Sequence, residues 1–146
     1  MSDKPRSTPE VTPKIVPKTV PWIVDVWVNL LRPLPPDENP DGAHVFGRYG
    51  MLDVLRRGTR PEELVAEMDA AAVAVAGLCG QDIAWVAEVC GRYPDRFFGI
   101  VCPDPTNIMA CVRTIERCVT EHGFKAVKIE PFLWAKPPTD AMYYPI

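Results

Sequence analysis

The sequence predicts an α/β fold in which four parallel strands alternate with helices and form part of a (β/α)8 barrel. Apolar runs typical of buried strands recur along the chain, separated by single stretches with helical spacing, in the order βαβαβαβ. Such alternation implies parallel strands joined by right-handed crossovers. A whole barrel takes about 250 residues, so 146 residues leave room for only part of one.

An open, doubly wound sheet is the competing architecture. The GxGxxG turn that binds dinucleotides is missing after the first predicted strand, and GxxxxGK[ST] occurs nowhere in the sequence. The absence of both glycine patterns weakens the open-sheet, nucleotide-binding alternative.

The chain starts with an arm in which every fourth residue is a proline, from Pro5 to Pro21. Each proline removes an amide donor and fixes φ, so neither a helix nor a central strand can form. We expect residues 1–20 to be a disordered, proline-rich arm, which serves either as a docking peptide or as a solvated leader. Residues 21–146 are expected to form the half-barrel domain.

The first predicted strand covers residues 22–30, WIVDVWVNL. In a strand, alternate side chains share a face, so Asp25, Trp27 and Asn29 are expected together, opposite the intervening valines. A strand that is polar on one face near its carboxyl end is typical of a barrel strand that borders a site.

The remaining elements are predicted from spacing and from start and stop residues. Residues 31–58 carry many prolines and glycines, which predicts a long irregular connection with one short helix over 51–57. Thr59–Arg60–Pro61–Glu62 has the pattern of a helix capping box. Further on, we expect strands at 71–78, 97–102 and 124–130, helices at 82–92 and 106–122, and a fourth helix capped by Thr139.

Composition excludes several classes of function. The net charge is -3 and no basic cluster is present, so nucleic acid is not an expected partner. The longest apolar run, residues 70–79, is too short to span a bilayer, and the first residues lack a signal-peptide pattern. The cysteines are odd in number and never spaced CxxC, which predicts neither a disulfide framework nor a zinc knuckle, and favours a cytoplasmic location: Cys79, Cys90, Cys102, Cys111 and Cys118.

Four stretches resemble a known family in their order and spacing. They are VDVWVNL at residues 24–30, EMDAA at 67–71 followed by VAVAGL, VAEVCGRYPDRFFGIVCPDP at 86–105, and GFKAVKIEP at 123–131. From Trp22 onward the chain is similar to the N-terminal half of amidohydrolase-related proteins (amidohydrolase family 2). The resemblance implies a barrel enzyme with a divalent metal such as zinc. It also implies hydrolysis or decarboxylation of a small carboxylate, including aromatic ones, or of a C–N substrate.

The sequence departs from the family pattern at the metal-binding positions. The two histidines of the first-strand D-x-H-x-H motif fall on Trp27 and Asn29, and the fourth-strand histidine is Glu130. The family's later ligands would lie beyond residue 146. We therefore expect this chain to be inactive alone and to need a missing C-terminal half or a second copy in a homodimer. The alternative is a non-catalytic relic that serves as a ligand-binding or interaction module.

Candidate site residues are those expected at the carboxyl ends of the strands, together with one loop histidine. Lys128 shares a face with Glu130 by alternation, so an internal ion pair with Glu130 or with Asp25 is the alternative to substrate binding. Trp27 could pack in the barrel or stack on a substrate. Cys79 and Asp104 are expected at the same mouth, but Asp104 more readily shapes a turn. The candidates are Asp25 and Glu130 as catalytic residues, Trp27, His44 and Lys128 as substrate-binding residues, and Asn29 as a metal ligand, although an amide oxygen is a poor donor for zinc.

Overall fold

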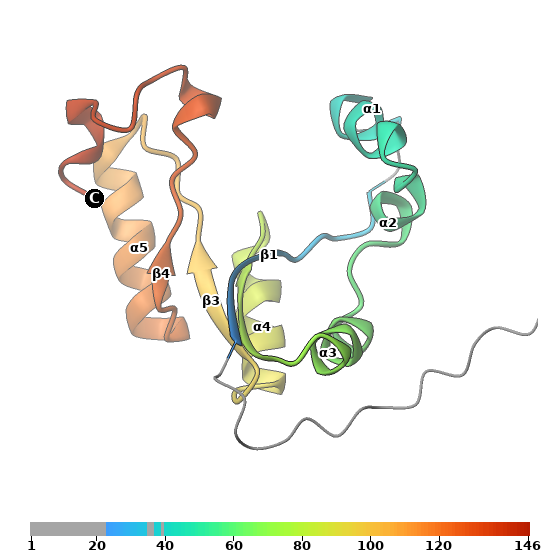
Figure 1. Ribbon diagram of the computed structural model, residues 1–146. Coiled ribbons are helices and arrows are strands. Elements are labelled where there is room, and N and C mark those ends of the chain that lie inside the picture. Colours follow the sequence, from blue (N-terminus) through green and yellow to red (C-terminus); the bar gives the residue numbers. More distant parts are fainter. Residues whose placement is uncertain (1–22, 35–36, 39) are drawn as a thin grey trace, which may run out of the picture.

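The computed structural model describes residues 23–34, 37–38 and 40–146 (Figure 1). The arm expected over residues 1–20 lies outside the described residues. None of the helices in the described ranges is long and apolar enough to cross a membrane. The elements are β1 (Ile23–Asn29), α1 (Pro40–Arg48), α2 (Leu52–Arg57), α3 (Pro61–Ala70), β2 (Val73–Cys79), α4 (Ile83–Arg92), β3 (Phe97–Val101), α5 (Ile108–His122), β4 (Ala126–Val127), and the 3-10 helices η1 (Pro131–Trp134) and η2 (Ala141–Tyr143).

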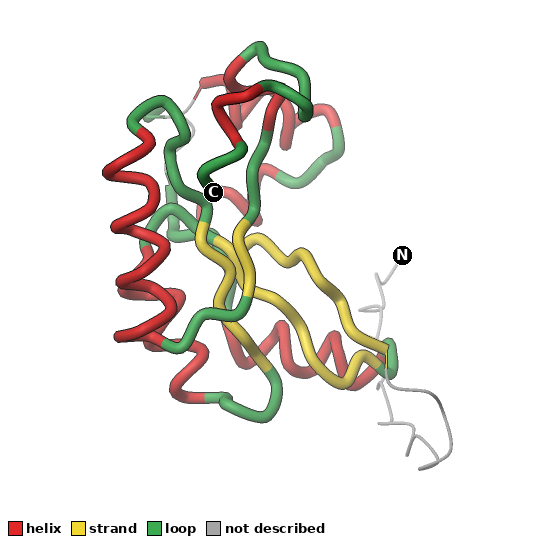
Figure 2. The backbone as a smooth tube through the Cα atoms, turned by 90° about the vertical axis from the view of Figure 1, so that its left-hand side faces the viewer, coloured by secondary structure: helices red, strands yellow, loops and turns green. Residues whose placement is uncertain are grey.

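The four strands form one sheet in the order β1-β2-β3-β4, and each neighbouring pair is parallel. A doubly wound sheet reverses its strand order at a switch point, whereas a barrel adds its strands in sequence. The sheet is curled, and α3, α4 and α5 flank its convex side (Figures 1 and 2). The predicted partial barrel is therefore confirmed.

The hydrophobic core lies between the sheet and these helices. Ala76 and Leu78 of β2 and Phe97 and Val101 of β3 are buried there. Because side chains alternate along a strand, the intervening positions, such as Cys79 and Ile100, face the concave side. The helices contribute Met68, Val86, Val89 and Cys118 to this core.

Two helices start close to their predicted positions, at Ile83 and at Ile108, because a polar side chain caps each one. Asp82 accepts a hydrogen bond from Trp85 N at 3.0 Å at the start of α4. Asn107 accepts one from Ala110 N at 3.2 Å at the start of α5. Both satisfy amide groups that have no partner within the helix. At the other end of α5, Gly123 adopts the left-handed conformation, with φ of 66°, as expected for a helix stop.

The connection after β1 is more regular than predicted. Residues 40–48 form the helix α1, so the expectation of irregular structure there was wrong. Pro40 occupies the first helical position, where the missing amide would have no partner in any case. The short helix expected over 51–57 is present as α2.

Thr59 does not cap α3, contrary to the predicted capping box. The residue before the helix is Arg60, which makes no side-chain cap bond. Instead, Thr59 Oγ1 accepts from Leu31 N at 3.0 Å and donates to Asn29 O at 3.3 Å. The hydroxyl therefore fastens the carboxyl end of β1, next to the candidate site.

The fourth strand is shorter than predicted, with two ladder residues in place of 124–130. Beyond Val101, β3 runs into Pro103 and Pro105, which offer no amide donors, so the ladder with β4 cannot continue. Thr139 starts no α-helix. Two short 3-10 helices occupy the end of the chain, and Asp140 caps the second one.

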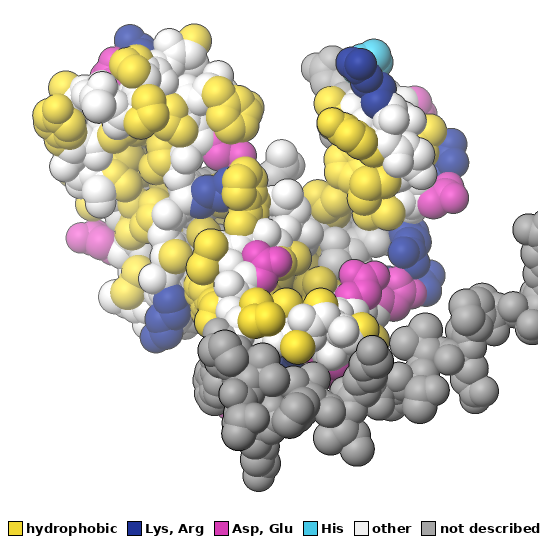
Figure 3. Space-filling model, in the orientation of Figure 1, with side chains coloured by type: hydrophobic (Ala, Val, Ile, Leu, Met, Phe, Trp, Pro, Cys, Tyr) yellow, Lys and Arg dark blue, Asp and Glu magenta, His cyan; other side chains and the backbone are white. Residues whose placement is uncertain are grey.

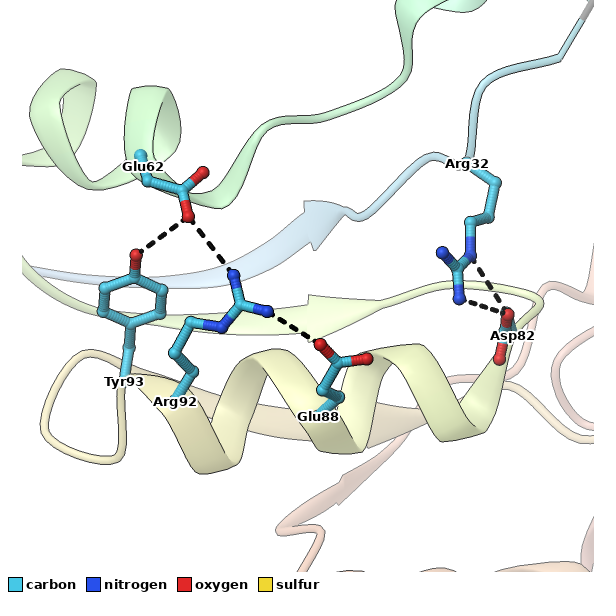
Figure 4. Close-up of polar contacts among 6 residues, drawn as sticks. All are labelled: Arg32, Glu62, Asp82, Glu88, Arg92 and Tyr93. Atoms are coloured by element: carbon cyan, nitrogen blue, oxygen red, sulfur yellow. Dashed lines mark hydrogen bonds and ion pairs between the residues drawn. The ribbon is translucent and has the colours of Figure 1, made fainter.

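Polar side chains join neighbouring segments outside the sheet at two places (Figure 4). In the first, Arg32 donates to Asp82 Oδ2 through Nε at 3.1 Å and Nη2 at 3.0 Å, and its guanidinium lies 4.4 Å from the centre of the Trp85 ring. This contact ties the segment after β1 to the start of α4. In the second, α3 is joined to α4 through Glu62, Tyr93, Arg92 and Glu88.

Replacing Asp82 with alanine is expected to lower the melting temperature at neutral pH and to have a smaller effect in acid. The Trp85 amide, and then the Arg32 guanidinium, hold the pKa of Asp82 below its ordinary value. The stabilisation is therefore complete above an unfolded pKa of about 4 and is lost as the pH falls through the lower folded pKa. Thermal unfolding at pH 7 and pH 3 checks this. Asp53→Ala is the control, because Asp53 is exposed and its ion pair among the described residues is with Arg56 of its own helix. If the two variants lowered the melting temperature equally at pH 7, Asp82 would not stabilise the fold in the way described.

Candidate functional site at the carboxyl ends of the strands

The first part of the site joins the ends of β1 and β2. Asn29 and Cys79 are paired residues in the parallel ladder. Asn29 Oδ1 accepts from Trp27 Nε1 at 3.0 Å and from the Cys79 thiol at 3.2 Å. Trp27 and Asn29 thus share a face, as alternation predicted, and the amide oxygen of Asn29 has a donor on both sides.

Lys128 lies at the centre of the second part. Its Nζ is 3.1 Å from Glu130 Oε1 and 3.8 Å from the centre of the Trp27 ring. It also donates to Cys79 Sγ across 3.9 Å, the longest of its polar contacts. The Lys128 and Glu130 side chains are only 16% and 25% exposed. Of the two ion pairs considered for Lys128, the structure contains the one with Glu130.

The strand register brings these residues together. Ile100 of β3 pairs with Cys79 of β2 on one side and with Ala126 of β4 on the other. Two residues farther along, alternation places Cys102 and Lys128 on the same concave face. Lys128 N bonds to Val101 O at 2.9 Å, which fixes the backbone of Lys128 beside the end of β3.

The two thiols of the site affect each other. The pKa of Cys79 is lowered to about 7, first because the Cys102 side chain donates a hydrogen bond to it. The charge of Lys128 adds to the lowering, whereas burial and the Glu130 carboxylate oppose it. The pKa of Cys102 is raised, because its proton is held in the bond to Cys79 and because it is partly desolvated.

Other predicted residues lie apart from this cluster. The Asp25 carboxylate is exposed and accepts from Trp27 N at 3.0 Å in its own strand. His44 is exposed on α1, where it lines a shallow pocket with Val45, Arg48 and Tyr49. Asp104 Oδ1 accepts from Thr106 N and Oγ1 at 2.8 and 2.7 Å, so it shapes a turn, as its position between two prolines suggested. Among the residues that the structure describes, no hydrogen bond or ion pair joins the side chains of Asp25, His44 or Asp104 to Lys128.

Cys102 is the member of the cluster that sequence reasoning missed. It follows β3 directly, two residues after Ile100, and the residue is exposed whereas Cys79 is buried. The alternation of side chains along β3 could have placed Cys102 on the concave face of the sheet. Its closeness to Cys79 depends on the register between β2 and β3, which the sequence does not state.

The site is open to small molecules. Figure 3 shows a hollow between the part that carries α1 and α2 and the part that carries α5 and the 3-10 helices, with many hydrophobic side chains along it. Trp27 is 53% exposed, so much of its ring is free for contact. A cation held over an indole ring, beside a carboxylate and a thiol, can bind an anionic group and move protons.

Comparison with known proteins gives one family match. Residues 24–146 match the family model described as Amidohydrolase. No curated protein matches the sequence.

Several solved structures are similar in fold. A 5-carboxyvanillate decarboxylase from Novosphingobium aromaticivorans, complexed with manganese and 4-hydroxy-3-methoxy-5-nitrobenzoic acid, gives a TM-score of 0.65 at 19% identity, over 86% of this chain and 46% of that chain. A 2,6-dihydroxybenzoate decarboxylase complexed with 2,6-dihydroxybenzoate gives 0.59 at 16%, over 76% and 40%. A 4-oxalomesaconate hydratase from Rhodopseudomonas palustris gives 0.50 at 22%, over 84% and 47%. The chain spans less than half the length of each.

Proposed function

This chain belongs to the amidohydrolase family, and we propose that it provides the substrate-holding half of a hydrolase or carboxy-lyase that acts on a small carboxylate. The observation that carries the proposal is the largely buried Lys128 ammonium, held over the Trp27 ring where the strands end. In α/β barrels the active site lies at the carboxyl ends of the strands. Two solved neighbours are decarboxylases complexed with aromatic carboxylates, which supports the substrate class.

Each residue of the cluster has a distinct part in this proposal. A carboxylate oxygen of the ligand takes the place of Cys79 Sγ at the Lys128 ammonium, because that 3.9 Å contact is the weakest one to give up. Trp27 offers the uncovered part of its ring to the apolar body of the ligand. Glu130 orients the ammonium and is the group placed for proton transfer.

Asp25 and His44 have no direct part in ligand binding in this proposal. The carboxylate of Asp25 holds the backbone of β1 in shape through Trp27 N, and so positions the indole ring. His44 lies on α1, where it lines a shallow pocket with other residues of that helix and its end. We expect its replacement to leave the affinity for a small carboxylate unchanged.

A divalent metal is implied by the family, and manganese is bound in the 5-carboxyvanillate decarboxylase. The residues that the structure describes do not fit such a metal. No group of three His, Cys, Asp or Glu side chains among the described residues could hold one. Asn29 already receives two hydrogen bonds at Oδ1, and the Lys128 ammonium would repel a cation at the same place. In this proposal, the Lys128 ammonium therefore supplies the positive charge that a metal ion at the end of the first strand would otherwise supply.

A second candidate function is favoured by the same replacement. With Trp27 and Asn29 at the positions of the family histidines, the chain could serve as a ligand-binding module without turnover. Incubation with a bound carboxylate, followed by chromatography, separates the two candidates. Loss of the carboxyl group or of a hydrolysable bond supports the enzyme. Because a half-barrel alone is expected to be inactive, an unchanged ligand supports the module only where light scattering shows the chain to be a homodimer.

Calorimetric titration tests the shared part of the proposal. We expect hydroxylated benzoates to bind the chain at least about tenfold more tightly than the matched benzamides, because only the carboxylate forms a charge-assisted bond with Lys128. The amides are the controls for hydrophobic contact with Trp27. Equal affinities for acids and amides would show that the ammonium plays no part in recognition.

A further inference from the structure

The side-chain amide of Asn29 is held in one orientation. Its Oδ1 accepts a hydrogen bond from Trp27 Nε1 at 3.0 Å and another from the Cys79 thiol at 3.2 Å. An indole N–H can only donate, so the amide atom that faces it is the oxygen and not the nitrogen. The two donors therefore fix which end of the amide is which, and Nδ2 occupies the other end.

The Nδ2 end of this amide carries two N–H donors. Among the residues that the structure describes, no hydrogen bond uses either donor, and Asn29 is exposed. The backbone behind the side chain is fixed as well, because Asn29 pairs with Cys79 in the ladder and its carbonyl oxygen accepts from Thr59 Oγ1 at 3.3 Å. A donor held on such a rigid base is suited to an acceptor oxygen of a bound molecule.

Asn29 and Lys128 contact the same two side chains. Cys79 Sγ lies 3.2 Å from Asn29 Oδ1 and 3.9 Å from Lys128 Nζ. The Trp27 indole donates to Asn29, and the Lys128 ammonium lies 3.8 Å from the centre of its ring. A ligand oxygen bound at Lys128 is therefore close to Asn29, beside an indole ring that is itself exposed.

We propose that Asn29 is a second binding residue for the carboxylate of the ligand, and that its Nδ2 donates to one carboxylate oxygen while Lys128 binds the other. This inference rests on the proposed function, because it starts from a carboxylate held at Lys128. The ammonium balances the charge of the ligand, whereas the amide recognises a second acceptor oxygen in the plane of the first. Together they select a carboxylate over a carboxamide, whose NH2 group meets the Nδ2 donors of Asn29 without an acceptor between them.

Asn29→Asp tests the proposal, because it keeps one end of the side chain and changes the other. Aspartate still offers an oxygen to Trp27 Nε1 and Cys79, but a second oxygen replaces the Nδ2 donors. The full chain is titrated by calorimetry with benzoate and with benzamide. We expect the variant to bind benzoate at least about tenfold more weakly than the wild type does, because a charge-assisted hydrogen bond gives way to repulsion between two carboxylates. Its affinity for benzamide should be unchanged or higher.

Asn107→Asp is the matched control. Asn107 Oδ1 caps α5 by accepting from Ala110 N at 3.2 Å, which an aspartate does equally well, so this variant adds the same charge outside the cluster. Its affinity for benzoate is expected to equal that of the wild type. If the two variants weakened benzoate binding equally, the net charge of the protein would explain the loss, and the proposal would be wrong.

The outcomes separate this inference from the proposed function. Equal affinities of the wild type for benzoate and benzamide would refute the role of Lys128, and the role of Asn29 with it. If the wild type prefers benzoate and Asn29→Asp keeps that preference, Lys128 recognises the carboxylate without Asn29, and only the present inference fails. Equal losses of affinity for both ligands in Asn29→Asp would also overturn it, because Asn29 would then act by positioning the Trp27 ring.

Nuclear magnetic resonance of the wild-type chain gives a second readout that does not depend on the folding of a variant. The side-chain amide protons of Asn29 are expected to shift downfield when benzoate is added, because they enter a hydrogen bond with a charged oxygen. They should move much less with benzamide. Asn29 amide protons that stay in place at saturating benzoate would overturn the proposal.

Discussion

Replacing Leu78 with alanine is expected to lower the free energy of unfolding by about 2–5 kcal/mol, the usual range for a buried leucine. Leu78 has no exposed surface and belongs to the core between β2 and the helices. Truncation removes apolar contacts and leaves a cavity that its close-packed neighbours can fill only in part. Urea denaturation followed by circular dichroism measures the change.

Leu133→Ala is the matched control for this prediction. Leu133 lies in η1 and is 60% exposed, so its truncation is expected to change the free energy of unfolding by no more than about 0.5 kcal/mol. Similar losses in the two variants would mean that the core does not lie where the sheet meets α4.

Lys128→Met is expected to weaken the binding of a hydroxylated benzoate by about tenfold or more. A hydrogen bond to a charged group contributes about 1.5–3 kcal/mol, and each 1.4 kcal/mol corresponds to a factor of ten. Methionine keeps much of the side-chain length over the Trp27 ring but removes the charge. Calorimetric titration of both proteins with the same acid measures the loss.

Lys125→Met is the matched control, since Lys125 is exposed just before β4 and its side chain makes none of the contacts found for Lys128. The neutral benzamide gives a second check, because its affinity should be equal in the wild type and in Lys128→Met. If Lys128→Met weakens acid and amide alike, the variant has disturbed the fold of the site, and the proposed charge recognition is wrong.

The order and type of most elements could be predicted from the sequence because local patterns determine them. Asp82 and Asn107 cap helices, Gly123 ends one, and apolar runs lie between them. The helix α1 escaped prediction, because its glycines and Pro40 suggested a loop. The length of β4 depends on how many donors β3 offers, and the prolines after β3 limit them.

The candidate site was only partly predictable, for a similar reason. Alternation alone placed Trp27 with Asn29, and Lys128 with Glu130. The contact of Lys128 with Trp27 links the first strand to the fourth and depends on the curl of the whole sheet. The choice of Glu130 over Asp25 as the partner of Lys128, and the approach of Cys102 to Cys79, likewise required the register between strands.

Whether Lys128 has replaced the metal is measured by calorimetric titration with manganese and then with a hydroxylated benzoate, on chain stripped of metal by a chelator. We expect no saturable binding of manganese and the same affinity for the benzoate with and without it, because Lys128 supplies the positive charge. One manganese bound per chain, with benzoate binding only in its presence, would show instead that the site is centred on a metal.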